Sequence, residues 1–502
     1  MLGGMQDWSL RVTHLIDHAA RECGSREIAT RWGDGTIERT SWAGVAHDAK
    51  RLAQALAALG LDKGDRVATL AMNHHRHLIA WYGAIGFGGV IHTLNVRLFD
   101  EQLVYIINHA EDRVLMYDAV FAPLVERLKP QLTTVEHYIC FDTDFVPLLD
   151  AHDGDFAWAT GDERDPCMLC YTSGTTGHPK GVLYEHRSTM LHAVAEIAPS
   201  VFDLSPQAVL LPIVPMFHAA SWGLPFAGAA AGVPTVWLAM FQHLDALADS
   251  GRAADLGKLK IVTIGGSACP RAMIERLMRM GIRVNHAWGM TETSPIGTMG
   301  APSAAWESLS FDQQVDETVR QGRVPFGVEL RIVGEDGATL QRDGKASGNL
   351  QIRGPWVVKR YFKAEADAVD ADQWFDTGDV AILHPDGTMQ ITDRSKDVIK
   401  SGGEWISSVE LENAAIGCAG VQEAAAIGIA HPKWDERPVL IVVKKPGEDV
   451  TEADVKAWLA DRIAKWWMPD RVLFVDELPH TGTGKIQKVA LRAQFKDFVL
   501  EG

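Results

Sequence analysis

The segment Tyr171–Gly181, YTSGTTGHPKG, constrains this chain more than any other part of it. Its glycines let the backbone fold closely around an anion, while its hydroxyls and the Lys180 ammonium can bind phosphate oxygens. It differs from the GxxxxGK[ST] phosphate loop, because Gly181 follows the lysine where that loop has Ser or Thr. Flexible surface turns are also rich in these small residues, but flexibility alone does not require a lysine after a run of hydroxyls. The segment therefore predicts a loop that binds a polyphosphate.

Alternating helix and strand patterns surround this loop. Apolar spacing predicts helices over 42–59, 78–85 and 101–108, and strands over 66–70, 90–94, 113–117, 167–170, 260–264 and 388–392. This order predicts an α/β fold with mainly parallel sheets that helices cover on both faces. The loop then lies just beyond the C-terminal end of a strand, where such folds bind ligands. The clearest boundary falls near Lys396, so we expect a large domain over 1–395 and a small α+β domain over 396–502.

The charge and the cysteines of the chain limit its partners. Because the formal net charge is −17, a polyanion as long as a nucleic acid is not an expected partner. An acidic protein that binds a nucleotide must gather positive charge locally, and Lys180, Arg394 and Lys485 are candidates for this. Six cysteines are scattered without a disulfide framework, as in a reducing compartment.

Targeting signals and metal clusters are not evident in the sequence. No stretch reaches the roughly 18 apolar residues of a membrane span, and the first residues do not form a signal peptide, so we expect a soluble, cytoplasmic protein. Cys167 and Cys170 are expected to be buried apolar residues, because no second pair completes a zinc site. His74, His75 and His77 do not share one helix face, which favours a solvated helix start over metal binding.

Several further motifs, far apart in the chain, indicate a resemblance to a known family. Beside YTSGTTGHPKG they are RLFD at 97–100, WGMTE at 288–292 and KWWMP at 465–469. With these motifs the chain, over about 15–495, resembles the adenylate-forming (acyl-CoA synthetase) enzymes. Within that superfamily it is most similar to bacterial medium-chain acyl-CoA ligases and 3-methylmercaptopropionate–CoA ligases. The resemblance implies an ATP-dependent ligase that forms an acyl-adenylate and then an acyl-CoA thioester from a short- to medium-chain acid. It implies Mg²⁺ as cofactor, with ATP, CoA and a carboxylic acid as substrates, and it leaves a homodimer as one option.

Most of the candidate site is assigned by this resemblance to the nucleotide. Asp379 would hold the ribose, whose hydroxyls can both be accepted by its two carboxylate oxygens, although Thr-Gly-Asp is also an ordinary turn. Arg394 would reach the same ribose, and a surface ion pair with a neighbouring aspartate is the alternative. The expected nucleotide-binding residues are Thr172, Ser173, Gly174, Thr175, Thr176, Gly177, Lys180, Gly266, Ser267, Ala287, Trp288, Gly289, Met290, Asp379 and Arg394.

Four residues are assigned to catalysis by the same resemblance. Thr291 would contact the phosphates, and Glu292 would hold Mg²⁺, which prefers hard oxygen ligands. Lys485, on a glycine-rich loop, would approach the acid and the α-phosphate, where its charge offsets the repulsion between two anions. His218 would stand near the acid, although a core histidine with satisfied hydrogen bonds is a real alternative.

The resemblance further assigns residues to CoA and to the acid. The small domain is expected to be mobile and to rotate about the hinge residue Lys396 between the two half-reactions. The expected CoA-binding residues are Ser401, Gly402, Gly403, Glu404 and Trp405. The candidate walls of the acyl pocket are Trp222, Trp237 and Pro295, because small-molecule sites are mostly apolar. Core packing explains each of these walls equally well.

The chain departs from the family between Phe226 and Val233, where only six small residues lie. Related enzymes carry about 30 residues more there, enough for one crossover unit. We therefore expect a gap or an altered strand order in the sheet beside the acyl pocket, with residues 233–237 displaced or more exposed than usual. Two alternatives to CoA ligation stay open. One is adenylation followed by transfer to another acceptor, and the other is a nucleotide- or acyl-binding protein impaired by the missing segment near 226–233.

Overall fold

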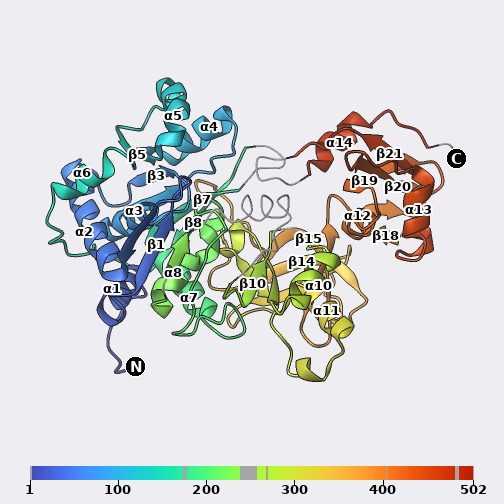
Figure 1. Ribbon diagram of the computed structural model, residues 1–502, viewed down its shortest axis with the longest axis horizontal. Coiled ribbons are helices and arrows are strands. Elements are labelled where there is room, and N and C mark those ends of the chain that lie inside the picture. Colours follow the sequence, from blue (N-terminus) through green and yellow to red (C-terminus); the bar gives the residue numbers. More distant parts are fainter. Residues whose placement is uncertain are drawn as a thin grey trace.

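Figure 1 shows the computed structural model of the chain, which describes residues 3–172, 178–233, 235–237, 257–266, 269–402, 404–480 and 486–500. Of Val236, Trp237 and Glu404, only the backbone is described. A large N-terminal part is followed by a separate C-terminal domain of strands and helices, drawn in red at the right of the figure. Among the described residues, no helix is both long enough and apolar enough to cross a membrane.

A six-stranded sheet forms the centre of the N-terminal part. Its strands are β3 (Arg66–Leu70), β4 (Val90–Thr93), β5 (Asp112–Tyr117), β6 (His137–Cys140), β7 (Pro166–Tyr171) and β8 (Gly181–Glu185). They follow the order β6-β5-β3-β4-β7-β8, and all neighbours are parallel except β7 and β8. The predicted parallel arrangement is confirmed, and the predicted strands agree with these bounds to within one residue.

Helices cover both faces of this sheet, as the sequence predicts. The helices of this region are α1 (Thr13–Glu22), α2 (Trp42–Ala58), α3 (His75–Phe87), α4 (Asp100–Ala110), α5 (Ala122–Leu128) and α6 (Phe145–Asp150). Val67 and Val114 are buried in one core with α2 and α3, whereas Ala68 and Leu115 are buried in another with α4 and α5. Successive side chains of a strand point to opposite faces, so neighbouring residues of β3 and β5 serve different cores.

Three smaller sheets are found among the described residues of the N-terminal part. The first contains β2 (Ile37–Ser41), β1 (Glu27–Arg31) and β9 (Thr235–Trp237), and the second contains β10 (Ile261–Ile264), β11 (Arg283–Gly289) and β12 (Ile296–Met299). The third contains β13 (Glu329–Val333), β14 (Ser347–Arg353), β15 (Phe375–Leu383) and β16 (Met389–Arg394). This third sheet is antiparallel throughout, which the helix–strand alternation of the first third of the chain could not indicate. The remaining helices among the described residues of this part are α7 (His186–Glu196), α8 (Leu224–Ala231), α10 (Arg271–Arg279) and α11 (Phe311–Val319).

The C-terminal domain has the mixed α+β character that the sequence predicts. Its strands are β17 (Ile399–Ser401), β18 (Glu404–Ile406), β19 (Val421–His431), β20 (Asp435–Lys444) and β21 (Arg471–Val475), and its helices are α12 (Ser408–Ile416), α13 (Glu452–Leu459) and α14 (Lys488–Gln494). Ala424 and Leu440 belong to one apolar core and Ala425 and Ile441 to another, so both faces of the sheet are covered.

The histidine cluster at the start of α3 is buried, which corrects the expectation of a solvated helix start. His74 Nε2 lies 2.8 Å from Asp118 Oδ1, and both His74 and His77 are buried. His77 Nε2 lies 2.9 Å from the hydroxyl oxygen of Thr69, and burial lowers the pKa of His77 to about 3. The helix begins at the end of β3, inside the fold, so its first polar side chains find partners within the protein instead of in water.

The short connection between Phe226 and Val233 is mostly helical. α8 contains most of the six small residues, and Gly232 ends it with a φ of +59°. Val233 is fully buried, and its carbonyl oxygen accepts a hydrogen bond from Trp42 Nε1 at 3.1 Å. Thr235 is also buried, and β9 pairs in parallel with β1. The expectation that this region is more exposed is therefore wrong for Val233 and Thr235, because α8 delivers the chain directly to the edge of β1.

Gly223, immediately before α8, gives a stability prediction. Its φ is +76°, and a Cβ there would lie 2.5 Å from Oε2 of the buried Glu196. We expect Gly223→Ala to destabilise the protein by about 2–4 kcal/mol through backbone strain and overpacking. Gly337 is the matched control, since its φ is +79° but no atom lies within 4 Å of a Cβ added there. Gly337→Ala should cost only the strain, about 1–2 kcal/mol. If denaturant unfolding shows equal losses of unfolding free energy for the two variants, overpacking against Glu196 does not contribute.

Candidate active site

The neck of the predicted phosphate loop is closed by hydrogen bonds between its ends. Thr172 N donates to Lys180 O at 2.9 Å, and Lys180 N donates to Thr172 Oγ1 at 3.2 Å. β7 and β8 lead into and out of the neck as an antiparallel pair, with Tyr171 opposite Gly181. The loop therefore starts and ends at one sheet position, where the sequence places it. Its other predicted residues, Ser173, Gly174, Thr175, Thr176 and Gly177, lie outside the described residues.

Thr291 and Glu292, two residues predicted to be catalytic, lie buried between β11 and β12. The Tyr361 hydroxyl donates to Glu292 Oε1 at 2.8 Å, and the Tyr184 hydroxyl donates to the carbonyl oxygen of Thr291 at 2.7 Å. Lys180 Nζ lies 4.8 Å from the centre of the Tyr361 ring. The loop lysine and the buried carboxylate thus meet at one tyrosine. Sequence reasoning missed Tyr361, because none of the motifs described above includes it.

The electrostatic surroundings of Glu292 suit a divalent cation. Burial raises the pKa of the Glu292 carboxyl, while the hydrogen bond from Tyr361 and the charge of Lys180 oppose this rise. Within the described ranges, no three His, Cys, Asp or Glu side chains gather as a metal site. A single carboxylate nevertheless fits Mg²⁺, which is often held by one or two carboxylates together with the phosphate oxygens of a substrate.

The residues predicted at the ribose come together. Asp379 on β15 lies opposite Arg394 on β16, and Arg394 Nε is 4.0 Å from Asp379 Oδ1. Trp288 Nε1 donates to Asp379 Oδ2 at 2.8 Å. Arg394 therefore pairs across the ladder with Asp379, while the side chain of the nearby Asp393 accepts hydrogen bonds from the backbone amides of Arg394 and Ser408. This arrangement supports the ribose-binding role of Asp379 and Arg394, which stays a prediction.

We expect Asp379→Asn to weaken ATP binding about tenfold, within the range for a hydrogen bond to a charged group. The substitution removes the negative charge that faces Arg394, but it preserves the size of the side chain. Asp376→Asn is a suitable control, because Asp376 is exposed in the same turn and accepts a hydrogen bond from Gly378 N at 3.0 Å. Calorimetric titration with ATP measures both variants. Equal affinities for the two would remove Asp379 from the nucleotide site.

Several predicted residues gather around β11. A Cβ on Gly265 would lie 2.6 Å from the Trp222 ring and 3.0 Å from the carbonyl oxygen of Ala287, so these groups are in close contact. Gly266 follows with a φ of +88°, which favours glycine. The carbonyl oxygen of Pro295 accepts a hydrogen bond from Met290 N at 3.0 Å. Trp222, Pro295 and the segment from Ala287 to Met290, which includes Gly289, therefore lie around one strand. Ser267 and the Trp237 side chain lie outside the described residues.

His218 lies close to the neck of the phosphate loop. It lines a small pocket together with Tyr171, Thr172, Thr93 and Asn95. The next four residues, 219–222, are not glycines, yet all have φ between +44° and +57°. Each left-handed residue costs about 1–2 kcal/mol, and such strain is often found at functional sites. The position of His218 fits its predicted role near the reacting groups.

The predicted CoA loop lies in the C-terminal domain. Ser401 ends β17, Gly402 follows it, and Trp405 lies on β18. Arg437 Nη1 donates to Ser401 Oγ at 3.2 Å, and Gly402 N donates to Trp434 O at 2.8 Å. These contacts hold the start of the loop, while its role with CoA stays a prediction. Gly403, the Glu404 side chain and Lys485 lie outside the described residues.

The predicted hinge, Lys396, is exposed and lies beyond Ser395, the residue that follows β16. On the N-terminal side of it, Asp393 Oδ1 accepts a hydrogen bond from Ser408 Oγ at 2.9 Å, and Asp393 Oδ2 accepts one from Ser408 N at 2.5 Å. Lys488 Nζ donates to Ser408 Oγ at 2.6 Å. Asp393, Ser408 and Lys488 are all buried. A buried polar cluster therefore joins the strand before Lys396 to the helices after it.

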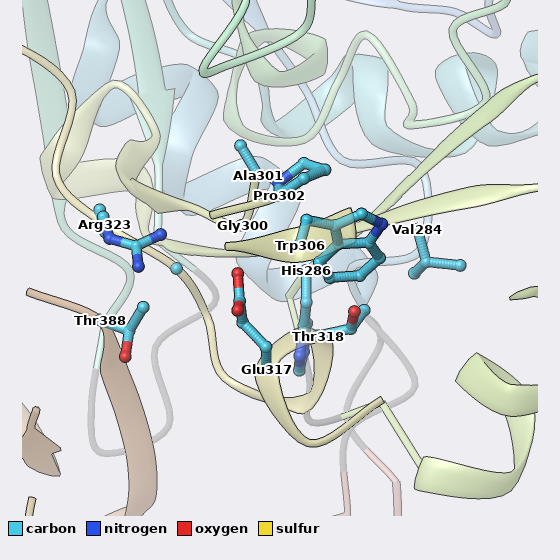
Figure 2. A pocket seen from close by; sticks show the side chains of 11 residues that line it. Val284, His286, Gly300, Ala301, Pro302, Trp306, Glu317, Thr318, Arg323 and Thr388 are labelled. Atoms are coloured by element: carbon cyan, nitrogen blue, oxygen red, sulfur yellow. The ribbon is translucent and has the colours of Figure 1, made fainter. Parts of the chain in front are cut away.

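A second pocket lies between β11 and α11, and Figure 2 shows the side chains that line it. None of the predicted site residues lines this pocket. His286 Nδ1 lies 2.8 Å from the carbonyl oxygen of Val319, and Glu317 Oε1 accepts a hydrogen bond from Ser303 N at 2.8 Å. These polar groups hold neighbouring segments together, so we assign the pocket no part in the reaction.

The fold and the site together define a class of protein. Residues 16–232 and 228–362 match the AMP-binding enzyme family, and residues 410–485 match the AMP-binding enzyme C-terminal domain. Since these ranges cover most of the 502 residues, the chain belongs to the AMP-binding enzyme family.

Two relatives and one solved structure are similar over the whole length. The chain is 47% identical to the 3-methylmercaptopropionyl-CoA ligase of Ruegeria pomeroyi over 548 aligned positions, which cover 100% of both chains. It is 42% identical to the medium-chain-fatty-acid–CoA ligase of Ectopseudomonas oleovorans over 543 positions, covering 100% of this chain and 98% of that one. The crystal structure of the anthranilate CoA ligase AuaEII in complex with anthranoyl-AMP superposes with a TM-score of 0.85 at 23% identity, covering 98% and 99% of the two chains. At this identity the superposition is evidence for the fold alone.

These comparisons also bear on the short connection. The alignment with the Ruegeria pomeroyi protein spans 548 positions against 502 residues of this chain, so at least 46 positions fall opposite gaps. The family match is broken into two pieces that overlap at 228–232, where the six small residues lie. Both observations support the expectation that a segment present in relatives is missing here.

Proposed function

We propose that this chain is an ATP-dependent ligase that joins a short- to medium-chain carboxylic acid to CoA through an acyl-adenylate. The observation that carries the proposal is the meeting of Lys180 and Glu292 at Tyr361, beside the closed neck of the phosphate loop. A cation from the loop and a buried carboxylate at one place suit the binding of a metal-bound triphosphate. The paired Asp379 and Arg394 supply hydrogen-bonding groups for a ribose. The CoA ligase names of the two relatives support the same reaction.

The residues proposed for the site supply positioning and charge more than covalent chemistry. Attack of a carboxylate on the α-phosphate brings two anions together, so cationic groups must offset their repulsion. Lys180 does this at the phosphates, and Lys485 does it where the acid attacks. The attack breaks the bond between the α- and β-phosphates and releases pyrophosphate, which leaves an acyl-adenylate. The CoA thiol then attacks the acyl carbon, loses its proton and displaces AMP, which is a good leaving group. Mg²⁺, when bound at Glu292, supplies further charge neutralisation at the phosphates.

The acid is proposed to be aliphatic or thioether-bearing, with 3-methylmercaptopropionate as the first candidate. Two related ligases named for that acid are 46% and 47% identical to the chain, whereas the relative named for medium-chain fatty acids is 42% identical. The pocket walls proposed for the acid are Trp222 and Pro295, together with Trp237. The domain division at residue 396 and the rotation of the C-terminal domain about Lys396 belong to the same proposal.

Pyrophosphate exchange with a panel of acids tests the proposal. The panel should include 3-methylmercaptopropionate and straight-chain acids of increasing length. We expect acid-dependent exchange of labelled pyrophosphate into ATP, followed by AMP release that depends on CoA. Exchange without CoA-dependent AMP release would favour an adenylating enzyme with another acceptor.

A second candidate is a nucleotide- or acyl-binding protein that no longer catalyses the reaction. The broken family match at 228–232 favours it, because the missing segment lies next to the proposed acyl pocket. The nucleotide site is built from other segments, so ATP binding should survive in either case. Calorimetry with ATP and with each acid separates the two candidates, since binding of ATP without binding of any acid would support the impaired protein.

A further inference from the structure

Tyr361 lies in an irregular segment, Val358–Phe362, that is tied at both ends to the proposed site. Val358 N donates to the carbonyl oxygen of Glu292 at 2.8 Å. At the other end, Phe362 N donates to the carbonyl oxygen of Gly181 at 2.8 Å. The segment therefore spans from the backbone of the metal-binding candidate to the end of the phosphate loop. No motif in the sequence marks it.

The Tyr361 side chain adds one contact to each of the same two partners. Its hydroxyl donates to Glu292 Oε1 at 2.8 Å, and its ring lies 4.8 Å from Lys180 Nζ. Glu292 is only 7% exposed, so this hydrogen bond lies where water competes little. A carboxylate has two oxygens and accepts hydrogen bonds at both. Fixing one oxygen therefore orients the carboxylate without using all of its capacity.

We propose that Tyr361 is a positioning residue that sets the Glu292 carboxylate and the Lys180 ammonium for binding of magnesium-bound ATP. This inference rests on the proposed function and deepens it. The hydroxyl holds the carboxylate in one rotamer, and the ring face holds the ammonium by a cation–π contact. Both groups are then already in place when the triphosphate binds, so little ordering remains to be done at that step. The hydroxyl contacts Glu292 and the ring contacts Lys180, so substitutions can remove the two contacts separately.

Two substitutions distinguish the effect of the hydroxyl from the effect of the ring. Tyr361→Phe removes the hydroxyl and keeps the ring over Lys180, whereas Tyr361→Leu removes both. Tyr184→Phe is the matched control, because it removes a buried hydroxyl that donates to the carbonyl oxygen of Thr291, next to Glu292, without touching its side chain. Thermal unfolding of each variant shows that it is folded before binding is measured.

Calorimetric titration with ATP, at a series of Mg²⁺ concentrations and in EDTA, tests the proposal. We expect Tyr361→Phe to raise the Mg²⁺ concentration for half-maximal ATP binding about tenfold, the scale of one hydrogen bond to a charged group. Its affinity for ATP in EDTA should not change. Tyr361→Leu should show the same shift and bind ATP in EDTA about threefold more weakly, since the cation–π contact is lost. Tyr184→Phe should resemble the unmodified protein in both measurements.

The outcomes distinguish a failure of the proposed function from a failure of the proposed role of Tyr361. If the unmodified protein binds no ATP, the proposed function fails and the role of Tyr361 fails with it. If ATP binds and Tyr361→Phe leaves its Mg²⁺ dependence unchanged, only the role of Tyr361 is overturned. A Mg²⁺ shift of equal size in Tyr184→Phe would also overturn it, because a general loosening of the buried site would then explain the effect.

Discussion

Replacing Lys485 with alanine is expected to slow acyl-adenylate formation by about 10²-fold or more, the scale of losing one preorganised charged donor. The carboxylate and the α-phosphate are both anionic, so their approach needs a cation at the point of attack. Lys485 itself lies outside the described residues, but the two ends of its segment are held together. The carbonyl oxygen of Pro479 accepts a hydrogen bond from Gln487 N at 2.7 Å, and His480 pairs with Ile486. The segments on either side of residues 481–485 are thus held together on the C-terminal domain.

The expected result differs between the two half-reactions. Pyrophosphate exchange measures adenylation, and single-turnover thioester formation from supplied acyl-adenylate measures the second step. In Lys485→Ala the second step should suffer much less than the first, because the acyl group is already activated as its adenylate and AMP is the group displaced. Lys496→Ala is the control, since Lys496 is an exposed lysine of the same domain. Equal losses in both steps would count against a role for Lys485 in adenylation.

The parts of the fold that could be predicted from the sequence depend on local chemistry. Glycines, hydroxyls and a lysine in one run have few structural uses, so the segment predicts a phosphate-binding loop, and β7 and β8 bear out its position at the end of a strand. Apolar periodicity fixed β3, β4 and β5 almost to the residue, because burial on both faces leaves a continuous apolar run. The α/β class followed from the alternation of such elements.

What the sequence could not indicate depends on contacts between distant residues. Tyr361 lies 69 positions from Glu292, and nothing near either residue reports their hydrogen bond. The His74–Asp118 pair spans 44 positions, so a histidine cluster that looked solvated proved to be buried. The six small residues before Val233 suggested that residues 233–237 would be displaced or more exposed than usual. Alanine is the best helix former, however, and most of the six residues belong to the helix α8, which leads into the buried Val233. Local composition was informative in each case, and tertiary partners decided the outcome.

Replacing Lys396 with proline should separate the two half-reactions in the opposite sense. Proline fixes φ near −65°, which restricts rotation at the proposed hinge. We expect Lys396→Pro to keep adenylation within about tenfold of the unmodified rate, roughly 1.4 kcal/mol in barrier height, and to lose most CoA transfer. Lys396→Ala is the control, because it removes the side chain and leaves the backbone able to turn. The same two assays, pyrophosphate exchange and single-turnover thioester formation, measure both variants.

The structure indicates what a rotation at Lys396 must overcome. Asp393 precedes the hinge and accepts two hydrogen bonds from Ser408, which follows it, in a buried cluster with Lys488. Turning the C-terminal domain about Lys396 would separate Asp393 from Ser408 and leave a buried carboxylate without these donors, a cost of a few kcal/mol unless new partners replace them. The orientation seen here is therefore held by more than the hinge backbone, and a proline at 396 adds a restriction to a state that is already stabilised. If Lys396→Pro forms thioester at the normal rate, the rotation occurs at another residue or is not needed. In the second case the Asp393–Ser408 contact persists through both half-reactions.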